Sequence, residues 1–237
     1  MTAKVILNPY AGRWKALKRQ AEVKSELTNA GVDYDFVATE HPGHGTELAA
    51  QAVRDGFTPI ISAGGDGSVS EVVNGIAREM LTQGLTTSIP LGILPLGSAN
   101  DLVVNLGLPV TLPESAKIIA NGHTRNIDLG EVKAWKQDKA QACTRYFDNN
   151  SAIGLEPSIT LIQQQIKWLH GPMRYLLATL IGVLKNPQWT MQLQWDQGSY
   201  EGGATLVTIG NNPLAGGLFY MTPHADPRDG LLTFVFG

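Results

Sequence analysis

The chain has 237 residues, 43% of them hydrophobic and 16% charged, and a formal net charge of −3. This composition is typical of a globular protein with a sizeable core and one large or two small domains, and the slight acidic excess gives no support for nucleic-acid binding. The single cysteine, Cys143, excludes an intramolecular disulfide framework and fits a reducing compartment. No signal-peptide pattern opens the chain, and the longest apolar stretch, 176–184, is too short to span a bilayer. We therefore expect a cytoplasmic protein.

Strands and helices alternate through the first half of the chain. Strands are predicted over 5–7, 33–38, 59–63 and 91–94, and helices from after Arg13 to about Ala30, from Thr46, from Val69, from Leu102 and over 114–121. This rhythm predicts a mostly parallel, doubly wound sheet. Ligands of such sheets bind beyond the carboxyl ends of the strands. The turns that begin at Asn8, Thr39, Gly64 and Pro95 are therefore expected to form one site.

The turn within residues 59–80 carries the most chemical information. Residues 64–67 read Gly-Gly-Asp-Gly after an apolar strand, and three glycines in four residues predict backbone angles that side chains forbid. Ser68 and Glu71 fit a capping box at the start of the following helix. A strand, a turn without side chains and a helix N-terminus together favour phosphate binding. Asp66 favours a bridging Mg²⁺ or a hydrogen bond to ribose or adenine. Neither the P-loop nor the Rossmann fingerprint occurs.

The alternation of strands and helices ends near residue 127. Strands are predicted over 130–135, 145–153, 190–196, 203–210 and 231–236, with helical residues over 158–185 interrupted at Gly171. We therefore predict an α/β nucleotide-binding domain over 1–126 and a β-rich domain with inserted helices over 127–237.

Seven ordered motifs carry a family resemblance. They are Asn8-Pro-Tyr-Ala-Gly, Gly64-Gly-Asp-Gly-Ser, Glu71-Val-Val-Asn-Gly, Pro95-Leu-Gly-Ser-Ala-Asn-Asp, Asp128-Leu-Gly, Phe147-Asp-Asn and Asp229-Gly-Leu-Leu. The set resembles the diacylglycerol kinase catalytic domain family, particularly its bacterial soluble lipid kinases, over nearly the whole chain. The resemblance implies that ATP binds the α/β domain, which is of the NAD kinase/diacylglycerol kinase type, and that a β-sandwich-like domain closes a cleft over a lipid hydroxyl.

The resemblance also implies a set of site residues. The implied nucleotide contacts are Asn8, Thr39, Gly64, Gly65, Asp66, Gly67, Ser68, Asn74 and Ser98, of which the two serines stand where the family usually has threonine. Asp66, Asp101 and Asp128 resemble the acidic set around Mg²⁺ and the phosphates, and Asp229 lies in a loop that resembles a structural metal loop. Phosphoryl transfer needs this combination of phosphate-binding N–H groups and metal-binding carboxylates.

Simpler interpretations stand beside these. Asp101 can cap the helix that begins at Leu102, and Asp128 or Asp229 can be turn residues. His41 and His44 are interpreted as loop surface, because no cysteine or third histidine lies nearby. Five apolar residues can line a lipid pocket, touch a membrane or pack in the core; they are Trp168, Leu169, Tyr175, Leu176 and Leu180.

One family feature does not occur. The family's catalytic base is an aspartate in a C-terminal Asp-Gly-Glu segment, which can take the proton of the lipid hydroxyl. No Asp-Gly-Glu occurs in these 237 residues, and the sequence stops within an expected strand. We therefore expect a C-terminally truncated kinase with an incomplete second domain, whose catalytic base lies beyond Gly237.

The sequence thus predicts an ATP- and Mg²⁺-dependent lipid kinase of phospholipid metabolism, acting on diacylglycerol or a similar lipid alcohol. It is expected to be cytoplasmic, peripheral to the membrane and without a nucleic-acid partner, and a homodimer is compatible with the resemblance. One alternative is a soluble-substrate kinase of the NAD kinase type, which shares the Gly-Gly-Asp-Gly turn. Another is a non-catalytic nucleotide-binding module.

Overall fold

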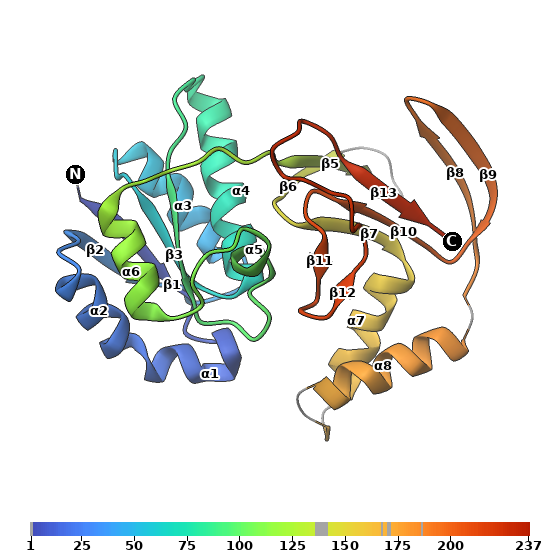
Figure 1. Ribbon diagram of the computed structural model, residues 1–237, viewed down its shortest axis with the longest axis horizontal. Helices are drawn as coiled ribbons and strands as arrows, with labels where there is room; N and C mark the ends of the chain where they lie inside the picture. Colours follow the sequence, from blue (N-terminus) through green and yellow to red (C-terminus); the bar gives the residue numbers. More distant parts are fainter. Residues whose placement is uncertain (1, 136–141, 167, 170–171, 186) are drawn as a thin grey trace.

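The computed structural model describes residues 2–135, 142–166, 168–169, 172–185 and 187–237. In its first half, a parallel sheet in the order β2-β1-β3-β4 consists of β1 (Ala3–Leu7), β2 (Tyr34–Ala38), β3 (Ile60–Gly64) and β4 (Leu91–Pro95). The helices are α1 (Ala11–Lys18), α2 (Gln20–Asn29), α3 (His44–Arg54), α4 (Asp66–Gln83), α5 (Asp101–Asn105) and α6 (Leu112–Asn121). The predicted parallel α/β sheet is confirmed (Figure 1).

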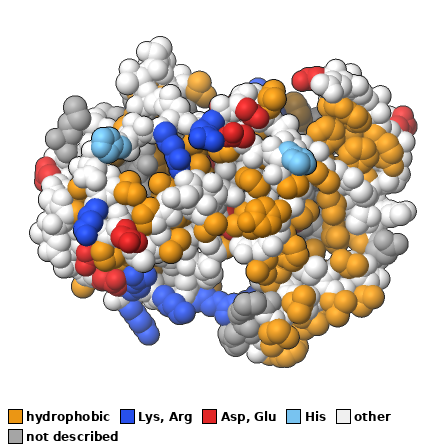
Figure 2. Space-filling view, viewed as in Figure 1, with side chains coloured by type: hydrophobic (Ala, Val, Ile, Leu, Met, Phe, Trp, Pro, Cys, Tyr) orange, Lys and Arg blue, Asp and Glu red, His pale blue; other side chains and the backbone are white. Residues whose placement is uncertain are grey.

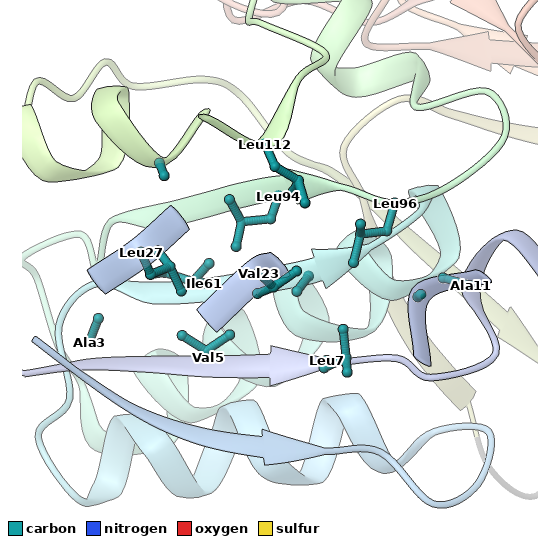
Figure 3. Packing of buried hydrophobic residues seen from close by; sticks show 13 residues of the cluster. Ala3, Val5, Leu7, Ala11, Val23, Leu27, Ile61, Leu94, Leu96 and Leu112 are labelled. Carbon is teal, nitrogen blue, oxygen red and sulfur yellow. The ribbon is translucent and has the colours of Figure 1, made fainter. Parts of the chain in front are cut away.

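Helices cover both faces of this sheet, because successive strand residues point to opposite sides. Val5 and Leu7 lie in a cluster with Val23 of α2 and Leu112 of α6 (Figure 3). Ile6 lies in a second cluster, with residues of α3 and α4. Burial on both faces explains why the strands read as continuous apolar runs in the sequence. The sheet is therefore doubly wound, as predicted.

The second half is rich in short strands. They are β5 (Gly130–Trp135), β6 (Ala142–Phe147), β7 (Asn150–Gly154), β8 (Trp189–Trp195), β9 (Gly198–Ala204), β10 (Leu206–Gly210), β11 (Leu214–Ala215), β12 (Phe219–Tyr220) and β13 (Thr233–Phe236). One sheet has the order β13-β10-β7, and β5-β6, β8-β9 and β11-β12 form hairpins. Helices α7 (Leu155–Gln165) and α8 (Pro172–Leu184) pack on each other. We call the chain through α6 the α/β domain and the chain from β5 onward the β-rich domain.

Several predicted elements are divided in the structure. The strand predicted over 145–153 breaks at Asp148 and Asn149, and the strand predicted over 203–210 belongs to two strands that meet at Thr205. Gly171, the predicted interruption between α7 and α8, lies outside the described residues. Among the helices that the structure describes, none combines the length and the apolar character that crossing a membrane requires.

The single helix predicted from after Arg13 to about Ala30 is instead divided at Arg19, and its regular part begins later than predicted. Gly12, Arg13 and Trp14 have φ values of 60°, 60° and 67°, in the left-handed region. Three such residues cannot continue a right-handed helix, and the conformation is costly for residues with a Cβ. The regular part of the helix pair therefore begins after Trp14, and α2 starts at Gln20.

The capping box predicted for α4 is wrong as well. Helix α4 begins at Asp66 with Gly65 as its N-cap and no capping side chain, so Ser68 lies inside the helix. The Glu71 carboxylate instead accepts hydrogen bonds from the N–H groups of Gly43, at 2.8 Å, and Gly45, at 2.9 Å. Glu71 therefore serves the N-terminus of the neighbouring helix α3, where a carboxylate also suits the helix dipole. The hydroxyl of Thr46, inside α3, donates to the Glu71 carbonyl oxygen.

Candidate active site

The predicted nucleotide residues other than Asn74 lie at one edge of the parallel sheet. Asn8 follows β1 and Thr39 follows β2, and backbone bonds continue the sheet there: Asn8 N donates to Ala63 O at 3.0 Å and Thr39 N to Leu7 O at 2.8 Å. Leu96 N donates to Gly64 O at 2.8 Å, which fixes the chain beyond β4 against the end of β3. The four turns predicted from the sequence therefore share one edge.

The two glycine turns of this edge pack backbone against backbone. A Cβ added to Gly97 would lie 2.5 Å from Gly65 Cα, and one added to Gly64 would lie 2.3 Å from Ser68 Oγ. Gly64, Gly65 and Gly67 do not have positive φ values, so the prediction of forbidden backbone angles is wrong. Gly64 and Gly65 are instead required because neighbouring atoms lie too close to leave room for a Cβ. A Cβ added to Gly67 would meet nothing within 4 Å, so this glycine leaves open space beside the first turn of α4.

Three polar side chains of the predicted set line one small cavity with Glu71. Asn8 Nδ2 donates to Ser68 Oγ at 2.9 Å, and Asn8 Oδ1 accepts from Tyr10 N at 3.0 Å. Thr39 lines the same cavity. Ser98 is exposed in the loop after β4, whose shape is fixed by Asn100 Oδ1 accepting from Gly97 N at 3.0 Å.

Asp66 and Asp101 form a carboxylate pair where the two domains meet. Asp66 is half-buried at the start of α4, and its Oδ1 accepts a long bond of 3.4 Å from Leu102 N. Asp101 does not cap α5. Its oxygens accept bonds from the N–H groups of Gly216, at 2.6 Å, and Gly217, at 2.7 Å, in the β-rich domain. Burial and then the Asp66 charge raise the Asp101 pKa, and the two N–H groups oppose this shift. This electrostatic strain favours a bound cation.

Asp128 and Asp229 belong to a different part of the structure. Asp128 Oδ2 accepts from Gly230 N at 2.8 Å, and Asp229 is exposed in the same loop, with its Oδ1 accepting from Leu231 N at 2.9 Å. Among the described residues, the predicted metal aspartates do not form a group of three with ligand oxygens within 4.8 Å of one another. The structure therefore does not bring Asp128 and Asp229 into one preformed ligand set with Asp66 and Asp101.

Asn74 connects the domains instead of facing the glycine turn. It is almost fully buried, its Nδ2 donates to Tyr146 O at 2.8 Å, and its Oδ1 accepts from Tyr146 N at 2.9 Å. The Asn74 amide thus forms two hydrogen bonds with the backbone of β6, as a residue of a neighbouring strand would. The prediction that Asn74 contacts the nucleotide has no support from this position.

Asp148 is a candidate functional residue to which the sequence analysis gave no role, although it lies in the Phe147-Asp-Asn motif. It is only 5% exposed, lies between β6 and β7, and its Oδ2 has no hydrogen-bond partner among the described residues. Burial, the largest cause, and the Asp66 charge raise the Asp148 pKa to about 6, against the opposite effect of nearby backbone N–H groups. The available signal was a charged residue in the middle of a predicted strand.

Stability should report this buried carboxyl through its pH dependence. The folded-state pKa lies above the ordinary 3.8, so the folded protein holds the proton more tightly, and ionisation destabilises the fold as the pH rises from about 4 to 6. We expect Asp148→Asn to gain about 2–3 kcal/mol in free energy of unfolding, relative to wild type, between pH 4 and pH 7 in the presence of a chelator. Urea unfolding of both proteins across this range measures it, and a constant difference would contradict the expectation.

The two histidines after β2 are closer to other ligand groups than predicted. His41 and His44 stack with ring centroids 4.6 Å apart, and with Glu47 they offer ligand atoms within 4.8 Å of one another. Glu40 N donates to His44 Nδ1 at 3.1 Å, which occupies the lone pair of the neutral ring. The surface interpretation is confirmed only in that His41 is exposed; the reason given for it overlooked Glu47.

The protein is a two-domain α/β protein. Its parallel α/β domain carries a glycine turn of the phosphate-binding type and meets the β-rich domain at a pair of carboxylates. Residues 2–132 match the diacylglycerol kinase catalytic domain, and residues 150–236 match the YegS C-terminal NAD kinase beta sandwich-like domain. The chain belongs to the diacylglycerol kinase catalytic domain family. The resemblance noted from the motifs is thereby confirmed.

Individual relatives agree with this assignment. A diacylglycerol kinase of Mycobacterium tuberculosis is 32% identical over 230 residues, which cover 96% of this chain and 70% of that protein. A diacylglycerol kinase of Staphylococcus saprophyticus is 27% identical over 234 residues, covering 98% of this chain and 72% of that protein. The crystal structure of a diacylglycerol kinase from Bacillus anthracis superposes with a TM-score of 0.69 and 26% identity, over 99% of this chain and 72% of that one. Membership of a kinase family implies ATP as a substrate.

Proposed function

We propose that this protein is a lipid kinase that transfers the γ-phosphoryl group of Mg-ATP to the hydroxyl of diacylglycerol or a similar lipid alcohol. The observation that carries the proposal is the position of Asp66 and Asp101. Both lie beside the phosphate-type turn and face the second domain, which Asp101 contacts through Gly216 and Gly217.

The chain's own residues supply positioning and charge control. The first N–H groups of a helix have no intrahelical partners. At the start of α4, Gly67 leaves space in which phosphate oxygens can approach these N–H groups. Asn8, Thr39 and Ser68 lie together at the same edge of the sheet, where their polar groups can hydrogen-bond to the nucleotide. Positioning and electrostatic stabilisation provide most of the catalysis in phosphoryl transfer.

The carboxylate pair fits Mg²⁺. Asp66 has only one long hydrogen bond among the described residues, and its charge raises the pKa of Asp101. Mg²⁺ prefers one or two carboxylates together with phosphate oxygens. When bound, it would neutralise charge that develops during transfer, with Asp66 as its ligand and Asp101 adding to the local negative field.

Gly67 offers a test of the phosphate position. Because an added Cβ meets nothing within 4 Å, we expect Gly67→Ala to keep or raise stability, by up to about 1 kcal/mol. The same methyl group would occupy the space of a phosphate, so ATP affinity should fall at least about tenfold, which is about 1.4 kcal/mol. Calorimetric titration with Mg-ATP and thermal unfolding measure the two effects. Unchanged affinity would place the phosphates elsewhere.

An apolar surface on α8 supports a lipid substrate. Five exposed side chains recur at helical spacing on this helix: Met173, Leu176, Leu180, Val183 and Leu184. Figure 2 shows hydrophobic side chains gathered over α8 at the lower right. The opposite face, with Ala178, packs on α7. An exposed apolar helix face of this kind is typical of peripheral contact with a membrane surface, and we propose that α8 makes this contact.

Changing this face should affect only membrane-embedded substrate. We expect a double variant, Leu176→Gln with Leu180→Gln, to phosphorylate diacylglycerol in vesicles about tenfold more slowly, because each leucine contributes about 1.5 kcal/mol or more on burial. Its rate on dispersed short-chain diacylglycerol should stay unchanged. Leu81→Gln, an equally exposed leucine on α4, is the matched control. An equal loss on both substrates would argue against a membrane role for α8.

Substrate identity is tested by supplying Mg-ATP with diacylglycerol, a sphingoid base and NAD in parallel, with each product identified by mass. The proposal expects phosphorylated diacylglycerol or a similar phosphorylated lipid. Phosphorylated NAD alone would favour the NAD kinase type. ATP binding without any transfer would favour a nucleotide-binding module.

A further inference from the structure

Two segments of the β-rich domain are joined behind the carboxylate pair. One segment contains Asp148 and Asn149, between β6 and β7, and the other contains Asn211 and Asn212, after β10. The N–H groups of Asn211 and Asn212 both donate to the Asn149 carbonyl oxygen, at 2.8 Å and 3.1 Å. Asp148 is 5% exposed, Asn211 0% and Asn212 1%. These bonds fix three oxygen-bearing side chains on adjacent, buried backbone.

The orientation of both amides is determined by their partners. Asn211 Nδ2 donates to Asp148 O at 2.9 Å and to Asp128 O at 2.8 Å, and Asn212 Nδ2 donates to Asp148 O at 2.8 Å. Flipping either amide would place its oxygen against a carbonyl oxygen. The two Oδ1 atoms therefore point away from these carbonyls.

On these three side chains, three buried oxygens remain without a hydrogen-bond partner among the described residues: Asp148 Oδ2, Asn211 Oδ1 and Asn212 Oδ1. Buried acceptors are normally satisfied, so each requires an explanation. None of the ion pairs among the described residues includes Asp148, and Asp66 adds a further negative charge to its surroundings. A cation bound among these oxygens would satisfy them and also compensate the charge, which a water molecule alone would not.

We propose that Asp148, Asn211 and Asn212 bind a hard divalent cation such as Mg²⁺, separate from any ion bound with the nucleotide. One carboxylate and two amide oxygens are the ligand types that such ions prefer, with water completing the coordination. The ion would lock the two segments together beside the backbone of Asp128. This site does not depend on the proposed kinase activity.

The test counts bound Mn²⁺ by electron paramagnetic resonance, without nucleotide or lipid, in an Asp66→Asn background that weakens the active-site ion. Asp148→Asn preserves the shape of the site and removes its charge. We expect it to bind one Mn²⁺ fewer, or to bind that ion at least tenfold more weakly. The melting temperature of the background protein should rise with Mg²⁺, and that of the Asp148→Asn variant should not.

Two further variants make the outcome specific. Asp196→Asn changes an exposed aspartate of the β-rich domain and should bind Mn²⁺ like the background protein. Asp229→Asn should also leave this ion bound. Equal Mn²⁺ binding with and without Asp148, or loss of the ion in Asp229→Asn alone, would overturn the proposal, as would the absence of Mn²⁺ binding at millimolar concentration.

Discussion

Replacing Asp66 by asparagine is expected to lower the rate of phosphoryl transfer by at least about 100-fold, the loss typical of removing one electrostatic contact to a transition state. The fold should not weaken. Within the described residues, the Asp66 side chain accepts only the long hydrogen bond from Leu102 N, and the Asp66 charge raises the pKa of both Asp101 and Asp148. Removing that charge should therefore preserve or raise the melting temperature.

Opposite effects on activity and stability are the signature of a functional carboxylate that is costly to the fold. Initial rates with Mg-ATP and a thermal unfolding scan measure both effects on the same preparation. Asp55→Asn, at the exposed end of α3, is the control and should change neither. Near wild-type turnover in the Asp66 variant would remove Asp66 from the active site.

Gly75→Ala is expected to cause a large loss of stability for the addition of a single methyl group. Gly75 lies where α4 crosses α3, and an added Cβ would be 2.3 Å from Thr46 O and 2.7 Å from Ala49 Cβ. The first of these neighbours is backbone, so the helices must separate. We expect a loss of about 3 kcal/mol, at the upper end of the range for overpacking.

Chemical denaturation measures this loss, and Gly67→Ala provides the comparison within the same helix. Both substitutions add a methyl group to α4, but only Gly75 faces another helix closely. Equal stability of the two variants would contradict the close contact between α3 and α4 at Gly75.

The parts of the fold that were predictable are those that local sequence determines. The apolar runs of β1 and β3 and the polar turns after them fix the parallel sheet and its ligand edge, because each run and turn is complete within about ten residues. The sequence analysis recognised that the central turn requires glycines, but the reason it gave for them was wrong. Gly65 is required by Gly97, more than thirty residues away in sequence, and no local pattern reports such an approach.

Long-range partners account for most of the other differences. Glu71 fits a capping box by spacing, yet its carboxylate binds the N–H groups of Gly43 and Gly45 on another helix. Asn74 pairs with Tyr146 across the domains. Asp101 was predicted as a site residue, but its contact with Gly216 depends on how the two domains pack. Side chains with several suitable partners are assigned by tertiary structure, which spacing alone does not determine.

Amide hydrogen exchange with and without Mg-ATP tests the central claim most directly, because it locates the nucleotide without requiring turnover. The structure predicts slower exchange in residues 64–68 and 96–102, where the two glycine turns meet, with little change in β8 and β9. Protection confined to other residues, with ATP demonstrably bound, would contradict the assignment of this edge as the nucleotide site.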